Sequence, residues 1–340
     1  MIKNGRLCVW SMLILLLLSL SACKTVESTD EDNLIEQLPA RLIRFDKDFF
    51  SIYPDNLTQQ SVERLKERYG DFFTYYAVGI LGISNPEQPQ FLQELKQFFD
   101  YSVTQEAYEQ VAEKFANVSR LNDELMKAFD RYSTHYKDSL VPKVYAYISG
   151  FNQPLMLTDS AVGVSLEMFL GRDALLYSEL GIAPYKQKNM YQERIPSEVV
   201  KAWAIGMYPW DAMGESLLAS MVHEGRLMYF VKTLMPNIAD TTLFGFTKEE
   251  LRWCNDFERE VWVDLVENKL LFETQYARVK RMVEDAPFTP MISRDSPGRT
   301  VCWVGYRIVE RYMKRSSATL QELMAEENVR MVLEQAEYNP

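Results

Sequence analysis

Histidine is scarce in this chain: His135 and His223 are the only two among 340 residues. Histidines so few and so far apart give no spacing that indicates a Ser/His/Asp triad. Positive charge is also in deficit, because 37 Lys and Arg face 48 Asp and Glu and leave a net charge of −11. Nucleic-acid binding requires a basic face, so this class of function is disfavoured.

Glycine-rich functional loops are missing as well. The segment 79–82, Gly-Ile-Leu-Gly, has neither the spacing nor the lysine of a phosphate-binding loop, and the chain contains no Gly-x-Ser-x-Gly elbow. It has no internal repeat, low-complexity block or obvious domain linker. The 47% hydrophobic and 25% charged residues are typical of a globular protein.

Long hydrophobic runs are confined to the N-terminus. Lys3 and Arg6 precede an apolar run over 7–20, which is too short to span a bilayer comfortably. The residues that follow, Leu-Ser-Ala-Cys at 20–23, are typical of a bacterial lipobox, in which the cysteine is lipidated and becomes the new N-terminus. The alternatives are a plain secretory signal with a chance cysteine, or a short anchor helix.

Only four cysteines occur, and the leader accounts for two of them. Cys8 is removed with the signal peptide and Cys23 carries the lipid, so Cys254 and Cys302 remain in the mature domain. An envelope compartment permits a disulfide between them, and two buried free thiols are the alternative.

We predict a signal peptide over 1–22, a lipidated N-terminus with a flexible tether over 23–40, and a single domain over 41–340. The tether is polar and acidic, which favours a solvated linker. Acidic residues after the lipidated cysteine also resemble signals that direct lipoproteins to the cell surface.

Apolar periodicity predicts a mainly helical α+β domain. The segment 42–50 fits the start of a strand or of a helix. Helices are expected over 61–77, from Pro86, from Thr104 to Phe115, over 119–136, from Pro196, over 214–236, from Thr247 to about 272, over 275–284, over 300–314 and after Thr319. Strands are expected over 143–150, 155–158 and 162–170, giving a small sheet between Pro142 and Gly171. Gly305 inside a helix predicts close packing against another element.

The helix over 214–236 carries His223-Glu224, the first half of the zinc-peptidase motif H-E-x-x-H. The second histidine is replaced by Leu227, which cannot bind zinc. Glu258 could stand for a carboxylate ligand, which still leaves the site one protein ligand short. Cys254 could substitute by composition, but its spacing does not support that role. We therefore interpret His223 as a hydrogen-bonded core or boundary residue and Glu224 as surface or partner charge.

A cleft lined by aromatic side chains, for a glycan or peptide, is a further possibility. Its candidates are Trp203, Tyr208, Trp210 and Tyr229, although core packing is the favoured role of each.

Several short segments resemble, in order and spacing, the gliding-motility lipoprotein GldB family. They are Leu166-Glu167-Met168-Phe169-Leu170-Gly171, Pro184-Tyr185, Leu217-Leu218 with Met221, Gly225-Arg226, Tyr229-Phe230, Pro236, Gly245-Phe246-Thr247, Trp253, Glu258, Trp262, Pro297-Gly298-Arg299, Gly305-Tyr306, Ile308-Val309 and Tyr312-Met313. The resemblance extends from about 41 to 340.

This resemblance implies a lipid-anchored envelope protein of Bacteroidetes-type bacteria, associated with gliding motility and its secretion apparatus. It also implies a fold similar to predicted zincin-like peptidases, with a small sheet before the central helix. We expect a non-catalytic protein at the outer membrane without metal or other cofactor, held by its lipid and contacting envelope, secretion or motility proteins. A zinc-dependent peptidase with a non-standard ligand set is the alternative, as is a glycan- or peptide-binding surface lipoprotein.

Overall fold

The computed structural model describes residues 40–340, which all belong to one compact unit. The expected signal peptide, Cys23 and nearly all of the tether lie outside these residues. The described chain is mainly helical and contains a small sheet, which confirms the α+β class with helices dominant.

Several helices precede the long strands in the chain. They are α3 (Phe45–Ser51), α4 (Gln59–Tyr69), α5 (Asp71–Tyr75), the π-helix η1 (Tyr76–Ile80), α6 (Phe91–Asp100), α7 (Ser102–Lys114) and α8 (Ser119–His135). The single helix expected over 61–77 is wrong, because Gly70 adopts φ of 56° and separates α4 from α5. Such a backbone conformation favours glycine and ends the helix. The helix expected from Thr104 begins earlier, at Ser102, and Thr104 is buried inside α7.

The sheet has four strands in the order β1-β2-β4-β3. The strands are β1 (Leu42–Ile43), β2 (Lys143–Tyr147), β3 (Leu155–Leu157) and β4 (Ala161–Ser165). β1 and β4 both run parallel to β2, and β3 is antiparallel to β4 at the edge. The sheet was expected to lie between Pro142 and Gly171, and this is wrong for its first strand, because β1 comes from the segment before α3. That segment supplies both a strand and a helix.

The third expected strand ends early, because residues 166–169 form the 3-10 helix η2 (Leu166–Phe169). Glu167 is fully buried there, and its Oε1 accepts hydrogen bonds from Ser149 N at 2.6 Å, Ser149 Oγ at 2.7 Å and Phe151 N at 3.2 Å. These hydrogen bonds to residues far away in the sequence stabilise η2 in place of a longer strand.

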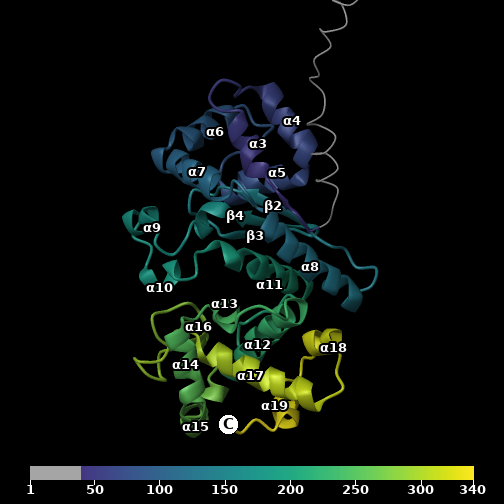
Figure 1. Cartoon of the computed structure of the whole chain (residues 1–340), viewed down its shortest axis with the longest axis vertical. Helices are drawn as coiled ribbons and strands as arrows, with labels where there is room; N and C mark the ends of the chain where they lie inside the picture. Colours follow the sequence, from purple (N-terminus) through teal and green to yellow (C-terminus); the bar gives the residue numbers. More distant parts are fainter. Residues whose placement is uncertain (1–39) are drawn as a thin grey trace, which may run out of the picture. The chain divides into compact units, whose positions relative to one another are not determined.

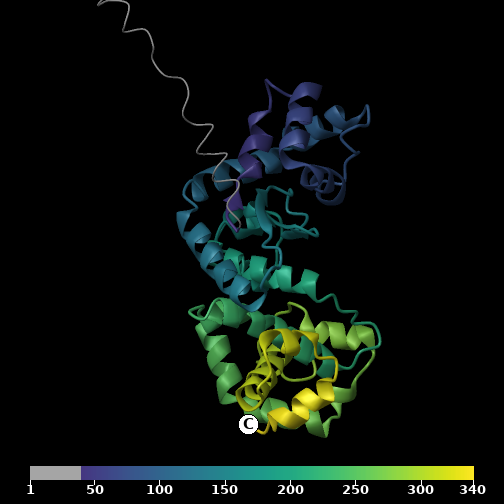
Figure 2. The same ribbon diagram turned by 90° about the vertical axis from the view of Figure 1, so that its right-hand side faces the viewer.

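The sheet lies between two groups of helices (Figures 1 and 2). Helices α3 to α7 cover one face, and α11 (Ile195–Met207) packs against β3 and β4 on the other. Aromatic rings fill the first interface: Phe45 contacts Tyr76 with centroids 4.9 Å apart, and Phe72 contacts Tyr145 at 4.1 Å. These four aromatic residues are buried and belong to the core.

The rest of the chain is helical. It comprises α9 (Leu175–Glu179), α10 (Pro184–Gln187), η3 (Gln192–Arg194), α11, α12 (Leu217–Leu234), α13 (Asp240–Phe244), α14 (Lys248–Asp256), α15 (Glu258–Glu267), η4 (Leu270–Phe272), α16 (Tyr276–Val283), α17 (Thr300–Arg315), α18 (Leu320–Ala325) and α19 (Val329–Ala336). The helix expected from Thr247 to about 272 is broken at Phe257 and again before η4. Thr247 and Glu250 form a capping box at the start of α14.

Helix α12 is the central helix expected over 214–236, and Ser216 caps it by accepting a hydrogen bond from Ala219 N. It packs most extensively on α17, which contains Gly305. A Cβ placed on Gly305 would lie 1.9 Å from the carbonyl oxygen of Met221. The predicted close approach at this glycine is confirmed.

Candidate functional site

His223 lies on α12 and stacks on the indole of Trp210, with ring centroids 4.3 Å apart and planes 15° apart. Burial lowers the pKa of its imidazole from 6.5 to about 4, although neighbouring Glu224 acts in the opposite direction. The ring is therefore neutral near pH 7 and one of its faces is covered by Trp210.

Glu224 is held by two cations. Its Oε2 accepts from Lys201 Nζ and from Arg299 Nη2, each at 2.9 Å. Burial opposes ionisation of this carboxyl, but the charges of Lys201 and Arg299 outweigh it and lower the pKa from 4.5 to about 2. Glu224 is thus a carboxylate shared between two cations, in contrast to the surface charge expected from the sequence.

The other residues considered for a zinc site lie apart from this pair. Leu227 is only 1% exposed and belongs to the core. Glu258 accepts from Arg307 Nε at 3.0 Å and from Tyr338 OH at 2.8 Å. His135 ends α8, where its carbonyl accepts from Gln321. Within residues 40–340, no group of three His, Cys, Asp or Glu side chains is arranged to hold a metal ion.

Both remaining cysteines, Cys254 and Cys302, are buried free thiols in the structure. Burial raises the pKa of each to about 12. They are therefore neutral, packed side chains near pH 7.

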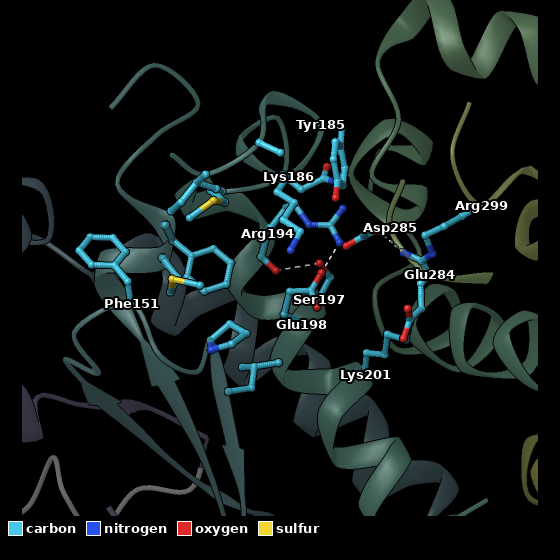
Figure 3. Close-up of a pocket in the computed structure, with 18 of the residues that line it drawn as sticks. Phe151, Tyr185, Lys186, Arg194, Ser197, Glu198, Lys201, Glu284, Asp285 and Arg299 are labelled. Carbon is cyan, nitrogen blue, oxygen red and sulfur yellow. Dashed lines mark hydrogen bonds and ion pairs between the residues drawn. The ribbon is translucent and has the colours of Figure 1, made fainter. Parts of the chain in front are cut away.

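A cleft of about 800 Å³ opens beside the Lys201–Glu224–Arg299 group, and Figure 3 shows that its lining is divided. Phe151 lies at one end, Arg299 and Asp285 lie at the other, and Arg194 lies between them. The apolar part is formed by Phe151, Pro154, Leu155, Met168, Phe169, Ile182 and Met190. The polar part includes Tyr185, Lys186, Asn189, Arg194, Ser197, Glu198, Lys201, Glu284, Asp285 and Arg299.

Helix α11 supplies one wall of the polar part. Arg194, Glu198 and Lys201 follow one another at intervals of four and three residues, which brings them onto one helical face. Arg194 forms an ion pair with Glu198 and donates to the carbonyl of Thr242 at 2.7 Å. Burial opposes ionisation of Glu198, but Arg194 and Lys201 outweigh it and lower the pKa of the carboxyl.

Arg299 enters from the start of α17. It adopts φ of 65° just before the helix and donates from Nε to the carbonyl of Val283 at 3.2 Å. A Cβ on the preceding Gly298 would lie 2.0 Å from the carbonyl oxygen of Ala286. This close approach places the segment after α16 beside the guanidinium, where Asp285 Oδ1 lies 3.5 Å from Arg299 Nη1.

The aromatic residues considered for a binding cleft do not converge. Trp210 stacks on His223, the hydroxyl of Tyr208 donates to that of Tyr136 at 3.0 Å, and Tyr229 lies 6.4 Å from Tyr306 between ring centroids. Trp203 is buried on α11.

The cleft residues were not identified from the sequence. Two local signals were present: the helical spacing of Arg194, Glu198 and Lys201, and the resemblance segments that contain Met168, Phe169, Tyr185 and Arg299.

None of the helices in residues 40–340 has the length and apolar character needed to cross a bilayer. No curated protein matches the chain. No solved structure matches it either, so the zincin-like fold stays a prediction. The protein-family model described as gliding motility protein GldB matches residues 27–340. The chain therefore belongs to the family of the gliding motility protein GldB.

Proposed function

We propose that this chain is a non-catalytic, lipid-anchored protein of the cell envelope that supports gliding motility, or its associated secretion machinery, through protein contacts. The observation that carries the non-catalytic part is the double ion pair of Glu224 with Lys201 and Arg299. The family match supplies the process.

The ion pairs disfavour the role that Glu224 would have in a zinc peptidase. Such an enzyme needs this carboxylate as a general base that takes a proton from metal-bound water. A pKa near 2 makes Glu224 a weak base at neutral pH, and its Oε2 already accepts two charge-assisted hydrogen bonds. His223 would also lack two further protein ligands.

The leader supports the envelope location. Lipidation at Cys23, with palmitate among the acyl chains, would hold the domain durably at a membrane, because several chains together bury many CH₂ groups. We propose the outer membrane, with the polar segment after Cys23 as the tether.

The cleft favours a binding role within this function. Its volume of about 800 Å³ lies in the range of ligand sites, and its lining combines an apolar part with a few converging polar groups. Segments that carry the family resemblance contribute Met168, Phe169, Tyr185 and Arg299 to its lining. We propose that a segment of an envelope partner binds here without being cleaved.

The test is complementation in a gliding bacterium that lacks its own copy of the gene. Wild type and His223→Ala should restore spreading equally, because stacking on Trp210 gives His223 a structural role. Metal content of the purified protein is measured in parallel. One equivalent of zinc in wild type, lost together with gliding in a folded and abundant His223→Ala variant, would reinstate the peptidase.

A further inference from the structure

The inner charges at the polar end of the cleft do not cancel, although an exposed cation, Lys186, and two exposed acids, Glu284 and Asp285, also line it. The least exposed cations there are Arg194, Lys201 and Arg299, whose side chains are 9%, 22% and 16% exposed. The least exposed carboxylates are Glu198 and Glu224, each 22% exposed. Three cations minus two carboxylates leaves a net charge of +1. This end of the cleft is therefore suited to one additional negative charge.

The nearby acids compensate this excess only weakly. The Asp285 side chain is 52% exposed, and its 3.5 Å contact with Arg299 is longer than the usual 2.7–2.9 Å of a charge-assisted bond. Glu284 is 59% exposed and pairs with Lys280. Solvent screens both carboxylates more strongly than the inner group.

The opposite end of the cleft is suited to an apolar group. Phe151 lies at that end in Figure 3, and the cleft lining also includes apolar Leu155, Met168 and Phe169. Burying an aliphatic or aromatic side chain against such residues removes apolar surface from water. Tyr185, Asn189 and Ser197 also line the cleft, and their polar groups suit the amides of a peptide backbone better than a continuous hydrocarbon chain.

We propose that the cleft binds the carboxyl-terminal end of a peptide whose last residue is apolar. The terminal carboxylate lies against Lys201, Arg194 and Arg299, and the last side chain lies against the apolar lining. This inference rests on the proposed function, since it identifies the partner segment that the cleft receives.

Binding of short peptides to the full-length protein tests the ligand class. The probes are N-acetyl-Ala-Ala-Leu as the free acid and as the carboxyl-terminal amide, measured by isothermal titration calorimetry. The acid should bind about 10-fold or more tightly than the amide, because a charged group and its hydrogen bonds are lost. Replacing the last leucine by glycine should weaken binding about 10-fold through lost apolar burial.

Lys201→Met tests the site. The variant lowers the inner net charge from +1 to 0 and leaves Glu224 paired with Arg299, so the acid should lose its advantage over the amide. Lys201→Arg should retain the advantage. Lys66→Met is the matched control, because Lys66 lies on α4, outside the cleft, and likewise forms an ion pair, with Glu87. Thermal melts check that each variant is folded.

Three results would overturn the proposal. Equal affinity of acid and amide for wild type, or no binding of either, rejects carboxylate recognition without requiring any variant. An undiminished preference in folded Lys201→Met rejects the site. Tighter binding of decanoate than of the peptide assigns the cleft to lipids. If any of these occurs while His223→Ala still restores gliding, the ligand assignment fails and the proposed function stands.

Discussion

Gly225 on α12 and Gly305 on α17 face each other so closely that a Cβ on Gly225 would lie 2.4 Å from the carbonyl oxygen of Gly305. The two helices therefore meet backbone to backbone. Any side chain at this crossing separates them, and both helices carry residues of the cleft, Met228 on α12 and Arg299 at the start of α17.

Gly305→Ala should destabilise the protein. Alanine favours a helix over glycine by about 1 kcal/mol, but the new Cβ would lie 1.9 Å from the backbone of Met221. We expect the steric clash to outweigh the higher helix propensity of alanine. The free energy of unfolding, measured in urea titrations, should fall by about 1–3 kcal/mol. Gly79→Ala is the control, because no atom lies within 4 Å of its Cβ position. A Gly305→Ala variant as stable as the control would contradict the close contact.

Leu227→His completes the H-E-x-x-H pattern but should not create a zinc site. Leu227 is 1% exposed, so the imidazole would be buried in the core and the free energy of unfolding should fall by about 1–3 kcal/mol. Leu175→His is the control: this leucine is 77% exposed, and the change should stay within about 0.5 kcal/mol. Unchanged stability together with a gain of one zinc per Leu227→His chain would show that the site is zincin-like.

Glu224→Gln should remove a stabilising charge in a pH-dependent way. The carboxyl has a folded pKa near 2 and an ordinary value of 4.5, so its contribution is present above about pH 4.5 and is lost as the pH falls toward 2. The shift corresponds to about 3 kcal/mol at pH 7. The advantage of wild type over Glu224→Gln in denaturant titrations should shrink below pH 4.5. The control is Glu109→Gln on the exposed face of α7, for which we expect a free energy of unfolding close to that of wild type. A difference between wild type and Glu224→Gln that does not change with pH would contradict the prediction.

His223 should titrate near pH 4 in proton NMR, because burial against Trp210 disfavours the imidazolium. Trp210→Ala should move this pKa upward toward 6.5. Since the chain has only two histidines, the spectrum of His135→Gln assigns the signal. A midpoint near 6.5 in the wild-type protein would mean that the ring is solvated.

Cys23→Ala should abolish incorporation of labelled fatty acid and release the protein from membranes. The expectation comes from the lipobox alone. Cys8→Ala is the matched control and should keep the label, since Cys8 is expected to leave with the signal peptide. Labelled Cys23→Ala protein that still sediments with membranes would reject lipidation at this cysteine.

Local interactions explain which helices could be predicted. The apolar spacing of Phe91, Leu95 and Phe99 and the capping boxes of Thr247 and Thr319 act over three or four residues, so a short stretch of sequence contains them. The glycine within α17 likewise indicated close packing, although its partner remained unknown from sequence.

Breaks and strand partners were harder to predict. β1 joins the sheet from about a hundred residues before its partner β2, with Leu42 opposite Val144, and the chain leaves β4 because buried Glu167 binds the Ser149–Phe151 segment. These outcomes depend on contacts between distant residues, which helical or strand periodicity does not record.

The sequence alone indicates the helical class, the central helix and the broken zinc-peptidase motif, because each depends on residue types at short spacings. It also indicates the family resemblance, which depends on the order of short segments along the chain. The role of Glu224 as a carboxylate shared by two cations depends on the three-dimensional structure instead. Its partners Lys201 and Arg299 lie 23 and 75 residues away along the chain, and ion pairing depends on distance in space. The tertiary structure also brings the charged and apolar residues of the cleft together.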